Sequence, residues 1–156
     1  MDLPTKMPLQ TGSLDNAGHP VINIEVYGVV PQLKREFEAM IDTGFTGFLM
    51  LPIVDAFPLG LVLYGTSNWT LADGRSSPKL LAYGTVLVGK KETHGVVVLE
   101  AGPCRPLLGI DFLRKSGKTL VVNELVVILW DTAEILKLAE ESKKAREKPS
   151  TEPPAT

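Results

Sequence analysis

The sequence has a single cysteine, Cys104, and only two histidines, His19 and His94, among its 156 residues. One cysteine excludes an intramolecular disulfide and cannot form a zinc site alone, and the two histidines lack ligand spacing. We therefore expect no metal and no other cofactor. Neither histidine lies at a sequence spacing from Cys104 that would indicate a cysteine–histidine catalytic pair, so Cys104 is not expected to act as a nucleophile.

Long apolar runs are also missing. The longest, Leu125 to Trp130, has the length of a strand and falls far short of the roughly 20 residues that span a bilayer. Residues 1–6 contain no apolar segment of a secretory signal, so the cytoplasm is the expected compartment and no membrane association is predicted. A formal net charge of -2 gives no electrostatic case for binding nucleic acid.

Strand signals dominate what is present. Hydrophobic residues make up 44% of the chain and charged residues 22%, which suits one globular core. Short β-branched runs broken by Gly, Pro, Asn and Asp predict an all-β fold. Strands are expected over residues 21–27, 35–41, 48–51, 66–71, 80–88, 93–99, 119–122 and 125–130. Residues 54–61 form either a helical turn or irregular structure, because Pro52 and Pro58 interrupt them.

Helix signals are few. Asp111 is expected to cap a short helix over residues 112–115, which Gly117 ends. Asp131 and Glu134 have the spacing of a capping box at the start of a longer, charged helix.

These patterns divide the chain into three parts. Residues 1–132 form the β domain, residues 133–148 a charged helix, and residues 149–156 a polar, proline-rich tail that is expected to be disordered. The helix is most simply a solvated extension of the domain.

The most informative segment runs from Ala39 to Pro52. One apolar run ends at Asp42-Thr43-Gly44, and a second apolar run follows Gly47. A carboxylate is normally excluded from such a setting, because burying an unpaired charge is costly. The glycines allow a sharp turn and close backbone approach. The pattern predicts a strand that delivers one carboxyl group to a turn, which is how an aspartic peptidase presents its acid.

Hydrolysis of a peptide by carboxylates requires two of them sharing one proton. The chain contains only one Asp-Thr-Gly. Asp131 lacks the glycine and begins a charged helix, and Asp111 fits a helix cap better than a catalytic acid. One acid per chain therefore predicts a symmetric homodimer with Asp42 from each copy on the twofold axis. The simpler alternative is that Asp42 is an ordinary turn residue.

Several separated segments resemble the motifs of one family in order and spacing. They are residues 40–47, residues 71–74, residues 107–113 and the upstream residues 15–21. Together they resemble the retropepsin-like aspartic peptidases, a single-domain family that includes the retroviral proteases and many bacterial relatives; the match is to the bacterial type. The resemblance covers about residues 12 to 131.

The resemblance implies a fold and a set of roles. The fold would be a closed acid-protease barrel with one short helix, and the C-terminal helix would be an extension of it. The partner would be a second copy of the chain and the substrate a peptide or protein. The implied site residues are the catalytic Asp42, its loop supports Thr43 and Gly44, the flap residues Ala72, Asp73 and Gly74, and the structural supports Leu108, Gly109 and Ile110.

The chain departs from the retroviral proteases in two respects. It carries extra residues at both ends, where those proteases form their dimer with short terminal strands. Its flap contains Asp73, Arg75 and Pro78 and is poorer in glycine.

Two other interpretations of the function stay open. The domain could be catalytically silent and bind peptides or partner proteins, or it could be a structural β domain that acts through its C-terminal helix. Trp69 and Trp130 are expected to be core or interface residues.

Overall fold

The structure is a computed structural model and describes residues 9–70 and 73–148. Its strands are β1 (Leu9–Leu14), β2 (Pro20–Tyr27), β3 (Arg35–Ile41), β4 (Leu49–Pro52), β5 (Val62–Thr70), β6 (Ser76–Val88), β7 (Lys91–Glu100), β8 (Leu107–Leu108), β9 (Lys118–Val122) and β10 (Val127–Asp131). Its helices are α1 (Ile53–Ala56), α2 (Ile110–Ser116) and α3 (Thr132–Glu147), with 3-10 turns η1 (Pro31–Leu33) and η2 (Phe57–Leu59).

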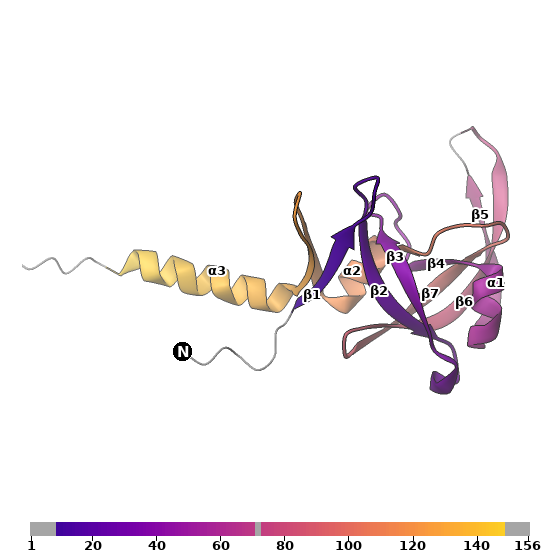
Figure 1. Cartoon of the computed structure of the whole chain (residues 1–156), viewed down its shortest axis with the longest axis horizontal. Helices are drawn as coiled ribbons and strands as arrows, with labels where there is room; N and C mark the ends of the chain where they lie inside the picture. Colours follow the sequence, from indigo (N-terminus) through magenta and orange to yellow (C-terminus); the bar gives the residue numbers. More distant parts are fainter. Residues whose placement is uncertain (1–8, 71–72, 149–156) are drawn as a thin grey trace, which may run out of the picture.

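The strands close into a barrel. Hydrogen bonding runs from β2 to β3, β8, β4, β7 and β6 in that order, and the pairing of β6 with β2 completes the ring. Strand β5 extends the barrel from β6, and β1, β10 and β9 extend it from β2 (Figure 1). The expected all-β closed barrel with a short helix and a C-terminal helical extension is confirmed.

Large apolar side chains fill the barrel. Phe48 from the turn before β4 packs on Phe112 of α2, with ring centroids 5.7 Å apart and an interplanar angle of 58°. Both rings are 1% exposed, and buried side chains from β2, β4, β8 and β10 surround them. Helix α2 therefore packs on the core immediately behind the segment that joins β3 to β4.

The shortest strand organises this region. Strand β8 lies between β3 and β4, parallel to β3, with Leu108 beside Ile41, and antiparallel to β4, with Leu108 beside Leu49. Leu108 is fully buried. The ends of β3 and β4 are thus held apart by one strand, and the loop that connects them must bend around its end.

Two helix starts differ from the sequence prediction. The residue that precedes α2 as its N-cap is Gly109, whereas Asp111 lies in the first turn and pairs with Lys115 at 3.2 Å. The prediction that Asp111 caps this helix is wrong, because the chain turns into the helix directly after β8. Asp131 is the N-cap residue of α3, but its carboxylate accepts a hydrogen bond from Lys118 Nζ at 2.6 Å in place of a backbone N–H.

The β5–β6 hairpin is longer than predicted, with 9 residues in β5 and 13 in β6. Residues 54–61, predicted to form either a helical turn or irregular structure, include most of α1 and all of η2. The predicted disordered tail, residues 149–156, lies outside the described residues.

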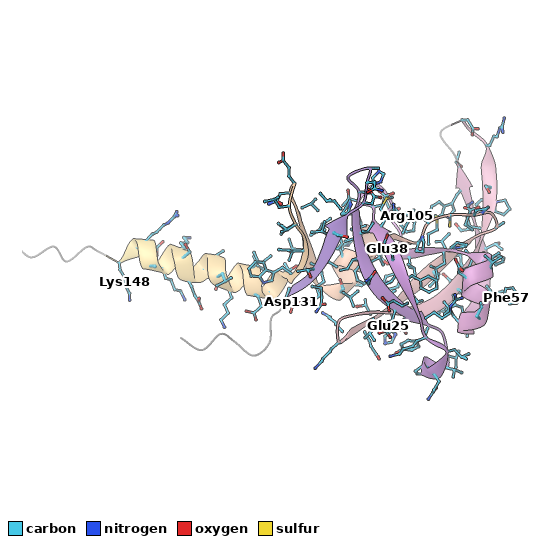
Figure 2. The ribbon with its side chains drawn as sticks, viewed as in Figure 1. Glu25, Glu38, Phe57, Arg105, Asp131 and Lys148 are labelled. Carbon is cyan, nitrogen blue, oxygen red and sulfur yellow. The ribbon has the colours of Figure 1, made fainter. Side chains whose placement is uncertain are left out.

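Helix α3 extends away from the barrel (Figure 1), and Figure 2 labels Asp131 and Lys148 at its two ends. None of its residues is buried, and Leu136 and Leu138 are 60% and 51% exposed. Its attachment lies in the first residue, Thr132, which donates its N–H to the Gly117 carbonyl at 2.9 Å. Among the described residues no helix is long and apolar enough to cross a membrane.

Because α3 buries none of its residues, removing it should cost the barrel little. We expect deletion of residues 133–156, which retains Thr132, to shift the melting temperature by no more than a few degrees. Thermal unfolding with light scattering on the same samples checks this. Loss of the cooperative transition on deletion would show that α3 stabilises the barrel.

Candidate active site

Asp42 lies directly after β3, half-buried at the start of the loop formed by residues 42–48, which we call the Asp42 loop. Its backbone N–H donates to the Leu108 carbonyl at 2.9 Å. Its carboxylate Oδ1 accepts the Gly44 N–H at 2.9 Å, and its carbonyl accepts the Phe45 N–H at 3.1 Å. The carboxyl group is therefore oriented by its own turn, and the turn is fixed to β8.

The residues after β8 hold the other side of the loop. Gly109 donates its N–H to the Phe48 carbonyl at 3.1 Å, and Ile110 donates to the Phe45 carbonyl at 2.9 Å. A side chain at Gly109 would collide with the backbone carbonyls of Gly47 and Phe45. Only glycine allows the two segments to approach this closely.

The fold brings one predicted group of site residues together. Asp42 and Gly44 share a hydrogen bond, and Leu108 and Ile110 bond to the same loop. Thr43 is exposed beside them. These five positions, with Gly109, form one compact loop system although Gly44 and Leu108 are 64 positions apart in the sequence.

The predicted flap is the turn of the β5–β6 hairpin, which projects from the barrel (Figure 1). Gly74 has a positive φ of 81°, and the Arg75 N–H donates to Asp73 Oδ1 at 3.0 Å. A tight, exposed turn therefore lies where the flap was predicted, in its Asp73 and Gly74 part. Ala72, the remaining predicted flap residue, lies outside the described residues.

Sequence reasoning missed an ion pair between this hairpin and the end of β7. Lys79 of β6 pairs with Glu100 of β7, and the two side chains are 11% and 26% exposed. The hydrogen bond from Lys79 lowers the pKa of Glu100. Burial, followed by the nearby Glu100 and Asp55 charges, raises the pKa of Cys104, which favours the neutral thiol.

Sequence reasoning also missed the contacts of Arg105 with the carboxylates of Asp15 and Glu38, which we call the Arg105 tether. Arg105 Nη1 donates to Asp15 Oδ2 at 2.5 Å, and Arg105 Nη2 lies 3.4 Å from Glu38 Oε1 (Figure 2 labels Arg105 and Glu38). Asp15 Oδ1 accepts the N–H groups of Ala17 and His19 at 2.9 and 2.8 Å. The segment that leads into β8 is thereby fastened to the turn between β1 and β2.

The Arg105 tether should make the stability of the protein depend on pH. The Arg105 guanidinium, followed by the His19 N–H, holds the pKa of Asp15 well below its ordinary value of 3.8. A carboxyl group with a depressed pKa stabilises the fold above its unfolded pKa, and this stabilisation is lost as the pH falls towards the folded value. Asp15→Asn is therefore expected to lower the melting temperature by a few degrees between about pH 7 and about pH 4.

Below about pH 4 the difference between the two proteins should narrow, because Asp15 is then protonated in the unfolded wild type but still ionised in the folded protein, so the stabilisation that it provides declines. Thermal melts of both proteins across this range check it. Glu38→Gln is the control and should have the smaller effect, since Glu38 is 60% exposed and its contact with Arg105 is longer. If the difference in melting temperature between the wild type and Asp15→Asn stayed the same from pH 7 to well below pH 4, the role of the Asp15 charge would be contradicted.

No group of three or more His, Cys, Asp or Glu side chains within residues 9–70 and 73–148 is arranged to hold a metal ion. An apolar cavity of about 150 Å³ lies at the base of β5, lined by Ile53, Ala56, Phe57, Leu61, Leu63 and Leu99. None of its lining residues belongs to the Asp42 loop.

Two solved structures share this architecture. A retropepsin-like aspartic protease from Rickettsia conorii aligns with a TM-score of 0.59 at 25% sequence identity, over 78% of this chain and 89% of that chain. EIAV protease complexed with the inhibitor HBY-793 aligns with a TM-score of 0.55 at 15% identity, over 70% of this chain and 99% of that one.

The sequence matches no protein-family model and no curated protein. The relationship therefore rests on the arrangement of the strands, which both solved structures share over most of their length. The chain has the retropepsin-like fold.

Proposed function

We propose that the protein is an aspartic endopeptidase that works as a homodimer, with Asp42 of each copy as the catalytic acid and base. The observation that carries the proposal is the position of Asp42. It is a half-buried carboxyl group on a braced Asp-Thr-Gly turn, in a fold shared with a structure described as a retropepsin-like aspartic protease.

The chemistry follows from bringing two such groups together. Two adjacent carboxyls cannot both ionise cheaply, so they share one proton. The ionised Asp42 takes a proton from a water molecule, whose oxygen attacks the peptide carbonyl carbon. The protonated Asp42 donates its proton to the carbonyl oxygen, giving a neutral tetrahedral intermediate. Collapse of that intermediate breaks the C–N bond, and a proton passes to the leaving amine.

The other predicted residues receive supporting roles in this proposal. Thr43 is exposed on the single chain, and in the dimer it would contact the second copy and support the paired Asp42 loops. Gly44 orients the Asp42 carboxyl, and residues 108–110 brace the loop from behind. The hairpin turn with Ala72, Asp73 and Gly74 would close over an extended peptide and exclude water.

The domain organisation belongs to the same proposal. Residues 1–132 would form the peptidase domain, and residues 133–148 would form a helix that catalysis does not need. Cleavage of peptides by the protein without residues 133–156 would support this division.

The test is cleavage of an unbiased peptide library by the purified protein from mildly acidic to neutral pH, with the mass in solution measured by light scattering. Cleavage by a dimer is the expected result. A well-folded dimer that binds library peptides without cutting any would instead support a catalytically silent binding domain. A strict monomer that cleaves would contradict the shared site.

A further inference from the structure

Phe45, three residues after Asp42, has an aromatic ring that its surroundings hold in one position. Its N–H bonds to the Asp42 carbonyl at 3.1 Å, and its carbonyl accepts the Ile110 N–H at 2.9 Å. The side chain is only 6% exposed. Gly47 packs against the ring so closely that an added Cβ would collide with it. The ring therefore cannot move without disturbing the Asp42 loop.

The β5–β6 hairpin covers this ring with its own aromatic side chain. Trp69 of β5 lies with its ring centroid 5.8 Å from that of Phe45, at an interplanar angle of 38°. It is half-buried, whereas its neighbours Asn68 and Thr70 are exposed. The register pairs Trp69 with Ser77 of β6, which is also half-buried between exposed neighbours. One face of the hairpin is thus turned towards the Asp42 loop, and Trp69 is its largest side chain at this level.

On the proposed function, a peptide that reaches Asp42 under this hairpin would place side chains beside the Phe45–Trp69 pair. Much of the space next to the loop is already filled by the two rings. We propose that Trp69 is a specificity-determining residue, which restricts the substrate positions beside it, one on each side of the scissile bond in the dimer, to small side chains such as Gly, Ala or Val. The inference rests on the proposed endopeptidase function.

Removing the indole should open space beside Phe45 without touching Asp42. A pocket that gains the volume of a ring accepts a larger side chain, and differences of this kind change the discrimination between substrates by about tenfold or more. Trp69→Ala should therefore raise kcat/KM for a large side chain relative to Ala at either of these two positions by at least about tenfold. Trp69→Phe, which keeps a ring on Phe45, should largely retain the wild-type preference.

The experiment starts from the best substrate found in the peptide library. Each residue flanking its scissile bond is replaced in turn by Gly, Ala, Val, Leu and Phe, and kcat/KM is measured for the wild type, Trp69→Ala and Trp69→Phe. Trp69→Val, which suits a strand better, covers the case in which alanine destabilises the hairpin. Thermal melts establish that each variant is folded.

Tyr64→Ala is the matched control. Tyr64 belongs to the same strand and also lies in an aromatic pair, stacked on Tyr83 with centroids 4.2 Å apart, but the two side chains are 44% and 55% exposed. A purely structural effect of losing an aromatic pair from β5 would appear in both variants as a general loss of activity. A change of preference at the symmetry-related substrate positions should appear only with Trp69.

The outcomes separate the two proposals. Relaxed size selection at a symmetry-related pair of positions in Trp69→Ala or Trp69→Val, absent from Trp69→Phe and Tyr64→Ala, supports the inference. Cleavage with the same size preference in all variants overturns it and leaves the peptidase assignment standing. Absence of any cleavage by the wild type removes the proposed function, and this inference with it.

Discussion

Replacing Asp42 with Asn is expected to reduce kcat/KM for peptide cleavage by at least about 10³-fold. An amide cannot accept a proton from water or hold the shared proton, and one substitution removes both carboxyls of the dimer. The fold should be unaffected, because the Asn carbonyl can still accept the Gly44 N–H that Asp42 Oδ1 now accepts. Steady-state kinetics on the library substrate, with melting temperature and mass in solution, measure all three expectations.

The control for this variant is Asp111→Asn. Asp111 is a carboxylate close in sequence to the same loop system, but its partner is Lys115 at 3.2 Å, in the next turn of α2. We expect its kcat/KM to stay within about twofold of the wild type. Comparable activity in Asp42→Asn and the wild type would rule out Asp42 as the catalytic group.

Replacing Gly109 with Ala is expected to destabilise the protein by at least about 3 kcal/mol and to abolish cleavage. The backbone at Gly109 has φ of -102° and ψ of -175°, which any residue can adopt, so the cost is purely steric. The new methyl group would collide with the carbonyls of Gly47 and Phe45, and backbone atoms cannot rotate away as side chains can. The contact that braces the Asp42 loop would have to open.

The matched control is Gly102→Ala, since an added Cβ there meets no atom within 4 Å. It should change the free energy of unfolding by no more than about 0.5 kcal/mol. Urea denaturation of the two variants and the wild type makes the comparison, and circular dichroism covers the case in which Gly109→Ala does not fold. Equal midpoints for the two variants would show that the loop does not depend on this close approach.

The Asp42 loop could be predicted because its signals are local. An apolar run, a carboxylate and two glycines follow one another within residues 39–52, and each has a direct physical meaning for a turn between buried strands. The barrel strands could be predicted for the same reason, although the beginnings of β5 and β6 could not. The missed part of β5 is apolar but exposed on both faces, so it shows no alternation, and the missed part of β6 is polar and contains a proline.

Strand β8 and its pairing with β3 and β4 could not be predicted from the sequence pattern. Two residues are too few for any periodicity, and their partners in β3 and β4 lie more than 50 positions away. The resemblance identified residues 107–113 as a motif, but the packing of Leu108 between two strands is a property of the assembled barrel. Asp111 was misplaced as a helix cap for the same reason, because the helix start is set by the end of β8.

The polar contacts around the site are equally nonlocal. Asp15 and Arg105 are 90 positions apart, and each reads as an ordinary surface charge in its own segment. Trp69 and Phe45 come from a hairpin and a loop that meet only in the folded chain. No feature of either residue's sequence neighbourhood indicates the other.

The central claim is that two copies of Asp42 form one site, and subunit mixing tests it most directly. A fixed amount of wild type is mixed with increasing amounts of Asp42→Asn under conditions in which the subunits exchange, and native mass spectrometry verifies the mixed dimers. The account predicts that activity per wild-type chain falls towards zero as mixed dimers replace wild-type dimers. Activity that stays proportional to the wild-type chains present would show that each chain carries a complete site and would contradict the account.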